Sequence, residues 1–479
     1  MTRQDRFPAL LAATTMGVYL LLVVGATATL SDAATACAAW PACGDGYTLP
    51  AETVGWIAIG HRLAALGVGA LVVATVVSAF RRSTSRRVRA SLSVVFLAYP
   101  VQAGLGAYVA TADASAVTST LHLGVGIAIF AAAMAALTWW LEAETGDPDE
   151  SVDAVGDADA VADLDYVDGT IDGTVEPAGD ASSPVPESGL PRLRATAAAY
   201  FRLMKPRLMW LLCLVAAAAM ALAGGPGFTP RTVALTLAGG SIAIGASGTF
   251  NHVLERDVDR RMQRTADRPL AVDLVSVRRA TAFGLLLTAL SVGLFWLVNP
   301  LAAGLGLLAI VFYSVVYTLV LKPNTVQNTV IGGAAGSLPA LIGWAAVTGE
   351  VGGGGLLLAA LIFLWTPAHF YNLALAYRED YARGGFPMMP VVRGETATRR
   401  HILWYLGATL VAAAILAATA DALGVLYVGV GVVLGAVFLW AVVRLHYERT
   451  ESAAFRAFHA SNAYLGLLLL AVVIDSMVV

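Results

Sequence analysis

Thirteen apolar runs, each about 20 residues long, constrain the fold of this chain more than any other feature of its sequence. A run of that length crosses the hydrocarbon core of a bilayer as one α-helix. The first four runs lie near 8–30, 54–80, 90–110 and 117–141. The other nine lie near 207–224, 232–250, 280–298, 300–320, 327–348, 354–375, 401–420, 422–443 and 459–478. With a mean hydropathy of +0.72, the chain is predicted to be an all-α polytopic membrane protein with about 13 transmembrane helices, which excludes a soluble enzyme.

The stretch between the two groups of runs is strongly acidic. Residues 142–191 contain fifteen Asp or Glu and no Lys or Arg, with Gly, Ser and Pro scattered among them. Such a segment buries too little apolar surface to offset the entropy of ordering, so we expect a disordered linker at 142–195. The linker divides the chain into a four-helix membrane domain at 1–141 and a nine-helix membrane domain at 196–479.

Arginine-rich loops indicate how the chain is oriented, because cytoplasmic loops of membrane proteins carry an excess of Lys and Arg. Five arginines follow the second run: Arg81, Arg82, Arg86, Arg87 and Arg89. Counting spans from there, the N-terminus and the loops at 251–279, 321–326, 376–400 and 444–458 fall on the same side. We therefore expect a multi-pass protein of the cell membrane, with the N-terminus and these polar loops cytoplasmic and the C-terminus outside. The first run is too long for the apolar core of a signal peptide and is read as a retained span.

The segment 251–268 is the most polar part of the second domain, and nine of its last fourteen residues are charged. If it is helical, Asn251, Glu255 and Asp259 project from one face as three oxygen-bearing side chains, which suit Mg²⁺. A second stripe with the same spacing is basic: Arg256, Arg260, Arg264 and Arg268. The two stripes together indicate a site for a metal and a diphosphate. The alternative is a solvated loop helix whose charges pair with one another.

A second polar cluster interrupts the apolar pattern at 365–390. Within it, His369, Asn372 and Asp380 share one broad helical face. Ionisable groups at the end of an apolar span are costly unless they line a hydrated cavity, so the cluster indicates one. The alternatives are an interhelical hydrogen bond for His369 and an ordinary interfacial charge belt for Arg378 and Glu379.

The only lysines are Lys205 and Lys322, and each lies in a short polar break between apolar runs. Where arginine has replaced lysine almost everywhere, two retained lysines suggest compact charges for phosphate. Chance combined with placement on the cytoplasmic side is an equal alternative.

These segments together resemble a known family. The pattern N-x-x-x-E-x-x-x-D at 251–259, followed by RRMQRTADRPL at 260–270, resembles the first Asp-rich motif of the UbiA-type intramembrane prenyltransferases. More narrowly, KPR at 205–207, YTLVLK at 317–322 and HFYNLALAYREDYARGGFPMMPVV at 369–392 resemble the haem O synthases, or protohaem IX farnesyltransferases. The match covers about 200–479. Two positions depart from the family pattern, namely Glu255 where aspartate is usual and Pro323 where arginine often follows the lysine.

The resemblance implies a nine-helix UbiA-type bundle that transfers a farnesyl group from farnesyl diphosphate to a vinyl group of protohaem IX, giving haem O. The catalytic residues it implies are Asn251, Glu255, Asp259 and Asp380, with one Mg²⁺ on the first three and a second on Asn372 and Asp380. The diphosphate would bind Lys205, Arg207, Arg264, Arg268, Tyr317, Lys322 and Arg378. The acceptor pocket would include His369, Asn372 and Tyr381. Two alternatives remain open: a UbiA-type enzyme acting on a quinone precursor or lipid, and a haem transporter without catalytic activity.

The first domain carries two further pairs of residues. Cys37 and Cys43 lie in the loop expected outside, where oxidising conditions favour a disulfide or redox pair. His61 and His122 lie on the second and fourth runs, a pattern compatible with bis-His haem ligation. A structural hydrogen bond is the alternative for each histidine.

Residues 8–141 resemble one four-helix half of the haem A synthases through CAAWPAC, GHR at 60–62 and LHLGVG at 121–126. Ala58 stands where that family has an acidic residue, and the family's second half is absent. The resemblance implies that this domain binds haem or passes it to the second domain. The expected partners are the lipid bilayer and, as a hypothesis, haem A synthase or oxidase assembly factors; no nucleic-acid partner is expected.

Overall fold

The computed structural model describes residues 6–30, 37, 39–41, 43, 50, 53–112, 115–147 and 189–478. Every regular element in these ranges is helical. The first part contains α1 (Arg6–Leu30), α2 (Thr53–Phe80), α3 (Arg86–Thr111) and α4 (Ala116–Thr145). The second part contains α5 (Gly189–Leu203), α6 (Pro206–Ala223), α7 (Pro230–Leu254), α8 (Arg256–Asp259), α9 (Val277–Trp296), α10 (Pro300–Val311), the π-helix η4 (Phe312–Leu321), α11 (Lys322–Asn324), α12 (Asn328–Thr348), α13 (Gly353–Ala376), α14 (Arg378–Arg383), α15 (Met389–Val392), α16 (Gly394–Thr419), α17 (Val425–Glu448) and α18 (Glu451–Val478).

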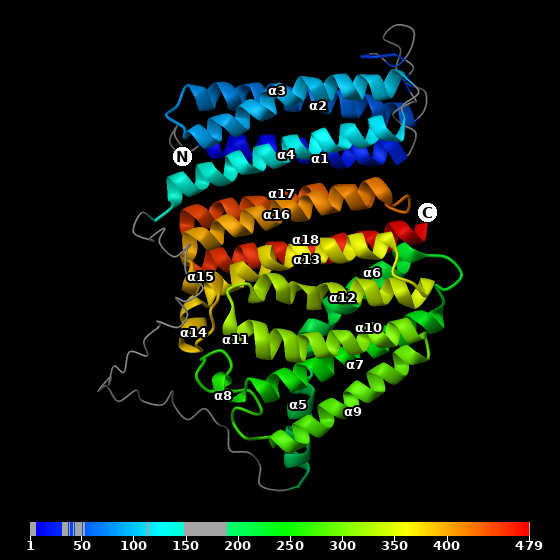
Figure 1. Cartoon of the computed structure of the whole chain (residues 1–479), viewed down its shortest axis with the longest axis vertical. Helices are drawn as coiled ribbons and strands as arrows, with labels where there is room; N and C mark the ends of the chain where they lie inside the picture. The colour runs from blue at the N-terminus through cyan, green and yellow to red at the C-terminus, as the bar shows by residue number, and fades with distance from the viewer. Residues whose placement is uncertain are drawn as a thin grey trace.

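The structure confirms the predicted all-α class and the number of spans. Within the described ranges, 13 helical segments are long and apolar enough to cross a membrane, four before the linker and nine after it. The long helices run side by side, with α1–α4 at one end of the molecule and α9 at the other (Figure 1). The chain is therefore a multi-pass membrane protein.

Several helices extend beyond the apolar runs that predicted them. α16 begins at Gly394 and α18 at Glu451, seven and eight residues before the expected starts at 401 and 459. The turns added to α16 contain an ion pair, in which the Arg399 guanidinium lies 3.1 Å from the Glu395 carboxylate one turn earlier. Hydropathy located the most apolar part of each helix and missed the first turns, which carry charged residues.

The helix α5 lies partly within the segment expected to be a disordered linker. It begins at Gly189, whereas the predicted linker extends to 195. Proline at 191 is compatible with the first turn of a helix, where its missing N–H has no intrahelical partner to lose. Residues 148–188, the acidic core of the predicted linker, lie outside the described residues, and the domain limits stay a prediction.

The two membrane parts share one hydrophobic core. A single cluster of buried side chains includes Phe7 of α1 and Phe130 of α4 together with Leu410 of α16 and Phe438 of α17. These four helices are neighbours in the middle of the molecule (Figure 1). The N-terminal part is therefore packed against the C-terminal part along the length of the spans.

An ion pair and two hydrogen bonds also join the N-terminal and C-terminal parts at one end of the spans. The Arg400 guanidinium lies 2.5 Å from the Glu142 carboxylate, and the Tyr447 hydroxyl donates to Glu144 at 2.8 Å. The Arg449 guanidinium donates to the carbonyl oxygen of Thr145, the last residue of α4. The end of α4 is thereby held on α16 and α17.

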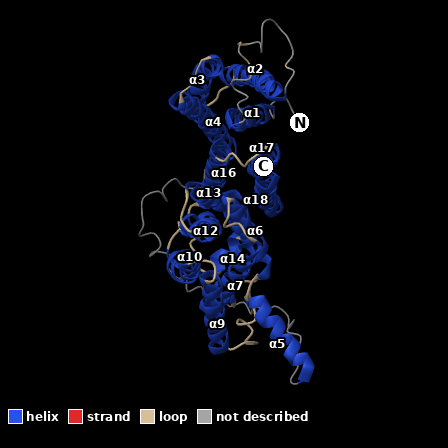
Figure 2. Cartoon of the chain, turned by 90° about the vertical axis from the view of Figure 1, so that its right-hand side faces the viewer, coloured by secondary structure: helices blue, strands red, loops and turns tan. Residues whose placement is uncertain are grey.

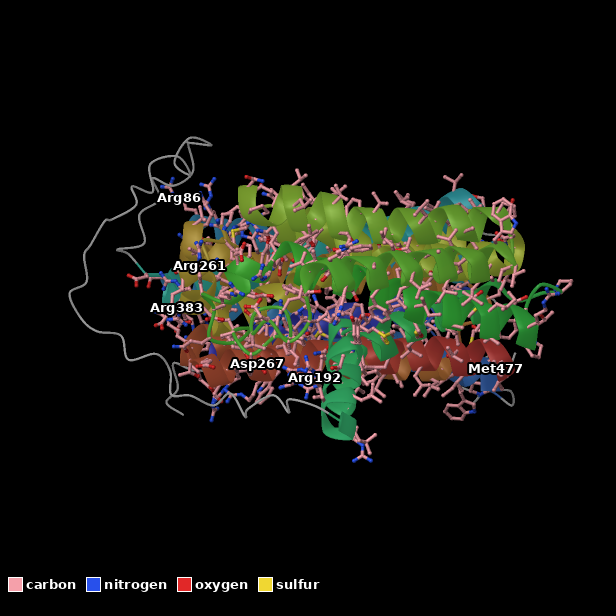
Figure 3. The ribbon with its side chains drawn as sticks, turned by 90° about the horizontal axis from the view of Figure 1, so that it is seen from below. Arg86, Arg192, Arg261, Asp267, Arg383 and Met477 are labelled. Atoms are coloured by element: carbon pink, nitrogen blue, oxygen red, sulfur yellow. A yellow bond between two sulfur atoms is a disulfide. The ribbon has the colours of Figure 1, made fainter. Side chains whose placement is uncertain are left out.

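The polar loops of both parts lie at the same end of the long helices. Seen from below, Arg86, Arg261 and Arg383 lie at the same end, whereas Met477 near the end of α18 lies at the opposite one (Figure 3). The start of α1 lies at the end where α8 and α14 are found (Figure 1). The relative sides therefore agree with the count of spans made from the arginine-rich loops.

Candidate active site

Asn251, Glu255 and Asp259 form the predicted row of oxygen-bearing side chains in the structure, although the helix that carries them is interrupted. α7 ends at Leu254, Glu255 takes the non-helical angles φ −97° and ψ 4°, and α8 contains only four residues. The amide N–H groups of Glu255 and Asp259 still donate to the carbonyl oxygens four residues earlier, at 2.9 and 2.8 Å. Asn251, Glu255 and Asp259 are thus one turn apart, and all three are buried.

The basic stripe does not continue along that face, because regular helix stops after Asp259. Arg256 and Arg260 both pair with the Asp273 carboxylate, at 2.9 and 2.7 Å. These two arginines therefore pair with a nearby acid, as the alternative interpretation of the segment proposed. Arg264 and Arg268 follow in the turns after α8, and only these two reach the acidic row or its surroundings.

Each member of the oxygen row contacts a cation, two of them from other parts of the chain and one from the turns after α8. The three pairs are Lys205 with Asn251, Lys322 with Glu255, and Arg268 with Asp259. The Lys322 ammonium lies 2.5 Å from Glu255 Oε1, and one Arg268 nitrogen donates to both Asp259 oxygens at 2.8 Å. The same Arg268 nitrogen is 3.8 Å from Glu255 Oε2, so it bridges the two carboxylates. Three cations and two carboxylates form one buried cluster.

Lys205 lies in an unusual backbone conformation at the start of α6. Its φ of 54° is in the left-handed region, where a residue with a side chain is uncommon. Gly248 of α7 allows this turn to pack closely, since a Cβ at that position would lie 2.8 Å from the Leu203 carbonyl oxygen and 3.2 Å from Lys205 Cγ. Burial, together with the charges of Arg268 and Lys322, lowers the pKa of Lys205 to about 7. A bound anion would therefore raise the pKa of Lys205 and favour its charged form.

The two carboxylates of the cluster respond differently to burial. Burial alone would raise the pKa of Glu255, but Lys322, Lys205 and Arg268 outweigh it and lower that pKa. Burial raises the pKa of Asp259 even though Arg268 acts in the opposite direction. Glu255, which lies nearest the lysines, is thus the more firmly ionised of the two.

The second polar segment meets the first through Asp380 of α14. Its Oδ1 accepts a hydrogen bond from the Gln263 amide N–H at 2.8 Å and lies 3.0 Å from the Arg383 guanidinium. Its Oδ2 is buried and has no hydrogen-bond partner among the described residues. Asp380 therefore joins the loop after α8 to α14 and keeps one carboxylate oxygen unused.

Aromatic rings surround the cationic groups of the cluster. Lys322 Nζ lies 4.2 Å from the centre of the Phe386 ring. Arg264 lies over Tyr377 and Tyr381, at 5.0 and 5.6 Å from the ring centres, and is exposed on its other side. The faces of aromatic rings attract cations without neutralising them, so Lys322 and Arg264 keep their charge for an anionic ligand.

The π-helix η4 contributes residues that the sequence analysis missed. Tyr313 places its hydroxyl 3.5 Å from Lys205 Nζ, and Thr318 accepts a hydrogen bond from the Asn251 side-chain amide at 3.3 Å. The Thr318 hydroxyl donates to the Tyr313 carbonyl at 2.8 Å, which ties the two residues together across the wide turn. The predicted Tyr317 is half-buried beside Tyr313, with ring centres 5.4 Å apart. The spacing Y-x-x-x-Y-T in the sequence could have indicated both residues.

Other predicted site residues lie apart from the cluster. Arg207 is exposed and makes no hydrogen bond or ion pair with the described cluster residues. Arg378 pairs with Glu395 at 3.2 Å. His369 is stacked between Trp365 and Phe458, and its Nδ1 lies 2.6 Å from the Ser461 hydroxyl. Both faces of its ring are covered by protein. The bond to Ser461 joins α13 to α18, which is the interhelical hydrogen bond that the alternative for His369 proposed.

The remaining two predicted acceptor residues are buried. Asn372 donates to the Ala368 carbonyl at 2.6 Å, while its side-chain oxygen has no partner among the described residues. Tyr381 belongs to a small apolar cluster with Met262 and Phe386, next to Arg264. Of the three predicted acceptor residues, the structure brings only Tyr381 to the polar cluster.

In the N-terminal part, His61 lies on α2 and His122 on α4, and a glycine of a further helix lies beside each of them. His122 Nε2 also lies 3.3 Å from the side-chain nitrogen of Gln102 on α3. A Cβ at Gly25 of α1 would lie 3.2 Å from His61 Cε1, and one at Gly106 of α3 would lie 3.1 Å from His122 Cε1. The Nδ1 atoms of both histidines are buried with no partner among the described residues. Gly25 of α1 thus leaves room for the imidazole of His61 on α2, and Gly106 of α3 leaves room for that of His122 on α4.

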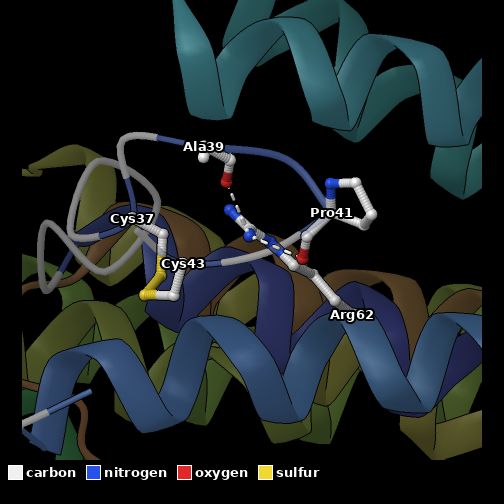
Figure 4. The surroundings of a disulfide bond; sticks show 5 residues. All are labelled: Cys37, Ala39, Pro41, Cys43 and Arg62. Atoms are coloured by element: carbon white, nitrogen blue, oxygen red, sulfur yellow. Dashed lines mark hydrogen bonds between the residues drawn. A yellow bond between two sulfur atoms is a disulfide. The ribbon is translucent and has the colours of Figure 1, made fainter. Parts of the chain in front are cut away.

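The two cysteines lie next to this region, at the end of the spans opposite to α8 and α14. A disulfide joins Cys37 to Cys43. Arg62 of α2 donates to the carbonyl oxygens of Ala39 and Pro41, at 2.9 and 3.1 Å (Figure 4). The cysteine loop is therefore fixed to the helix that carries His61.

Comparison with known sequences assigns the C-terminal part to a family. A profile described as the UbiA prenyltransferase family matches residues 211–468, which is more than half of the chain. The chain belongs to the UbiA prenyltransferase family. A second profile, described as a cytochrome oxidase assembly protein, matches residues 51–162 and so covers most of the N-terminal part.

Relatives of this UbiA-family chain match it from end to end. A protein named protoheme IX farnesyltransferase 1, from Natronomonas pharaonis, is 60% identical over 477 residues, covering 100% of both chains. Protoheme IX farnesyltransferase from Haloquadratum walsbyi is 57% identical over 476 residues, covering 99% of this chain and 97% of that protein. A solved structure of a UbiA homolog from Archaeoglobus fulgidus bound to GPP and Mg²⁺ aligns at 19% identity and a TM-score of 0.43, covering 57% of this chain and 99% of that one.

Proposed function

We propose that this UbiA-family enzyme transfers a farnesyl group from farnesyl diphosphate to a vinyl group of protohaem IX, giving haem O. The names of its full-length relatives support this acceptor and donor. The contact that carries the proposal in the structure is the 2.8 Å hydrogen bond from the Gln263 amide to Asp380. It unites two polar segments, more than 100 residues apart in sequence, into one charged site at one end of the bundle.

The cations of the cluster would bind the diphosphate. In the transfer, the bond between farnesyl C1 and the diphosphate oxygen breaks, and its electron pair leaves with the diphosphate. Lys205, Lys322 and Arg268 would stabilise that growing negative charge by exchanging their present partners for phosphate oxygens. Farnesyl C1 then bonds to one vinyl carbon and water adds to the other, and the proton that this water loses passes to the diphosphate or to solvent, which leaves a hydroxyalkyl substituent.

The oxygen atoms at the site fit a magnesium ion. Magnesium prefers oxygen ligands from one or two carboxylates together with substrate phosphates. Asn251, Glu255 and Asp259 supply such atoms, and the unused Oδ2 of Asp380 is a buried oxygen without a partner in the described structure. No three His, Cys, Asp or Glu side chains within the described ranges are grouped as a metal ion would need, so the substrate phosphates would complete the coordination. When bound, Mg²⁺ would supply further positive charge for the departing diphosphate.

The neighbouring rings have a protective role in this proposal. Tyr313 is half-buried between Lys205 and the Tyr317 ring, and Tyr381 is buried next to Arg264. These rings would keep bulk water from the allylic cation while presenting their electron-rich faces to it. Roles for His369 and Asn372 in the acceptor pocket, and for Arg207 and Arg378 in diphosphate binding, stay predictions.

A UbiA-type enzyme acting on a quinone precursor or a lipid could use the same diphosphate site, so the acceptor must be tested directly. We expect the purified full chain, given Mg²⁺ and farnesyl diphosphate, to convert protohaem to a product whose mass has increased by a farnesyl group and one hydroxyl group. No farnesylated product is expected from aromatic acids or glycerol-phosphate lipids. Formation of those products, with protohaem unchanged, would contradict the proposed acceptor; no product from any acceptor would favour a haem transporter.

We further propose that the N-terminal part binds haem between His61 and His122, as the resemblance to haem A synthases implies. The buried Nδ1 atoms of both histidines, which have no partner among the described residues, support this, as does the space left beside each imidazole by Gly25 and Gly106. We expect the full chain to show the absorbance of a low-spin bis-His haem, and His61→Ala to lose it. His459→Ala, in α18, is the matched control and should keep the spectrum. A spectrum unchanged by His61→Ala would remove this site from the proposal.

The orientation is proposed from the arginine-rich loops. They place the end that carries α8 and α14 in the cytoplasm of the cell, with the C-terminus outside. A partnership with haem A synthase or oxidase assembly factors fits the production of haem O and remains a proposal.

A further inference from the structure

The helix α5 leaves an apolar stripe exposed. Leu190, Leu193 and Phe201 have exposed fractions of 59%, 66% and 60%, and Ala197 between them is also exposed. These positions are three or four residues apart, so they share one face of the helix. Three large apolar side chains in a row on a solvated helix would be unfavourable in water.

The other side of α5 is firmly packed, so the exposed stripe is a fixed feature. Ala199 and Leu203 are almost completely buried against Leu270, Val275 and Ala280. The Tyr200 ring also contacts that of Phe283 in α9, with centres 4.9 Å apart. The helix is held in place on one face and presents its apolar stripe on another.

The direction of α5 differs from that of the spans. In Figure 2 the long helices are seen nearly end-on, whereas α5 is seen along its length and slants away from the bundle. It therefore runs across the direction of the spanning helices, as a helix lying parallel to a membrane surface does. At 15 residues it is also too short to cross a bilayer.

The charge of α5 identifies the surface that the stripe would meet. The helix contains Arg192, Arg194 and Arg202 and no acidic residue, and Arg202 pairs with Asp267 at 2.7 Å. Helices with an apolar stripe flanked by arginine lie in the interface of bilayers that carry anionic lipids. We propose that α5 is an in-plane anchor that inserts Leu190, Leu193 and Phe201 into an anionic membrane surface on the side of the candidate active site.

This anchor would act directly on the start of the site. α5 ends at Leu203, two residues before Lys205, and the connecting turn packs against Gly248. Fixing α5 at the membrane surface would therefore hold the backbone from which Lys205 reaches Asn251. The anchor itself does not depend on which acceptor the enzyme uses.

The test uses the full chain in lipid nanodiscs and requires no activity. The variant Cys213→Ser removes the free thiol, and Leu193→Cys then accepts an environment-sensitive dye. In phosphatidylcholine containing phosphatidylglycerol, we expect a blue-shifted dye that is quenched by lipids brominated on their chains. The same dye at Ala198→Cys, an exposed position off the stripe, should remain in water.

Charge dependence provides the second measurement. Membranes of phosphatidylcholine alone, or the added substitution Arg194→Gln, should weaken quenching at position 193. A dye at 193 that stays in water in both membranes would overturn the proposal. A dye shielded from water but not quenched by brominated lipid would also overturn it, because the acidic segment before α5, and not the membrane, would then cover the stripe.

Discussion

Replacing Glu255 by Gln is expected to lower prenyl transfer by about 100-fold or more while leaving the protein folded. Loss of one group that stabilises charge in a preorganised site typically has an effect of that size. The amide oxygen of Gln can still accept from Lys322, which now lies 2.5 Å from the carboxylate. The rate of farnesyl transfer and the thermal unfolding temperature, measured on the same preparation, check this expectation.

Two further variants separate chemistry from stability at this position. Glu255→Ala leaves the Lys322 ammonium buried without its partner, and breaking a buried pair in this way costs about 3–5 kcal/mol, so both activity and unfolding temperature should fall. Asp257→Asn, an exposed position in the same short helix, should change neither. Activity close to that of the natural protein in Glu255→Gln would show that this carboxylate takes no part in the reaction.

Replacing Asp380 by Asn is expected to lower the maximal rate by a similar factor and to raise the Mg²⁺ concentration needed for half-maximal activity. The substitution keeps an oxygen for the Gln263 amide and removes the charge of the carboxylate whose Oδ2 is unused. A purely structural role for Asp380 would change the unfolding temperature without changing the Mg²⁺ requirement. The measurement is therefore a Mg²⁺ titration of the transfer rate, set beside an unfolding curve.

The neighbouring Glu379 provides the control for this prediction. Its side chain is 92% exposed and lies 4.0 Å from Arg383, so Glu379→Gln should leave both rate and Mg²⁺ dependence unchanged. Equal effects of the two substitutions, or an unchanged Mg²⁺ dependence in Asp380→Asn, would contradict a metal-binding role for Asp380.

The cluster also explains how such a site can remain buried before substrate binds. Its two carboxylates offset the charges of Lys322 and Arg268, and the third cation, Lys205, donates to the uncharged side-chain amide of Asn251. A diphosphate with its metal would bring both a new anion and a new cation. The pairs could then be exchanged without leaving any charge uncompensated, which keeps the cost of desolvation low.

The sequence by itself determined the features that depend on local pattern. Apolar runs of about 20 residues identified the 13 spans, because every backbone group in a bilayer must be bonded within its own helix. The four-residue spacing of Asn251, Glu255 and Asp259 placed them in one row, which survived a break in the helix because the i to i−4 hydrogen bonds persist. The family resemblance likewise depended on short motifs that can be read along the chain.

Only the tertiary structure decided which distant groups meet. Hydropathy could not show that Arg256 and Arg260 turn toward Asp273 while Arg268 turns back to Asp259, since that depends on how the chain leaves α8. It could not show that Tyr313 approaches Lys205, that His369 is enclosed by Trp365 and Phe458, or that α1 and α4 pack against α16 and α17. Spacing along a helix fixes the face on which a side chain lies, whereas its partner is set by the packing of segments far apart in the sequence.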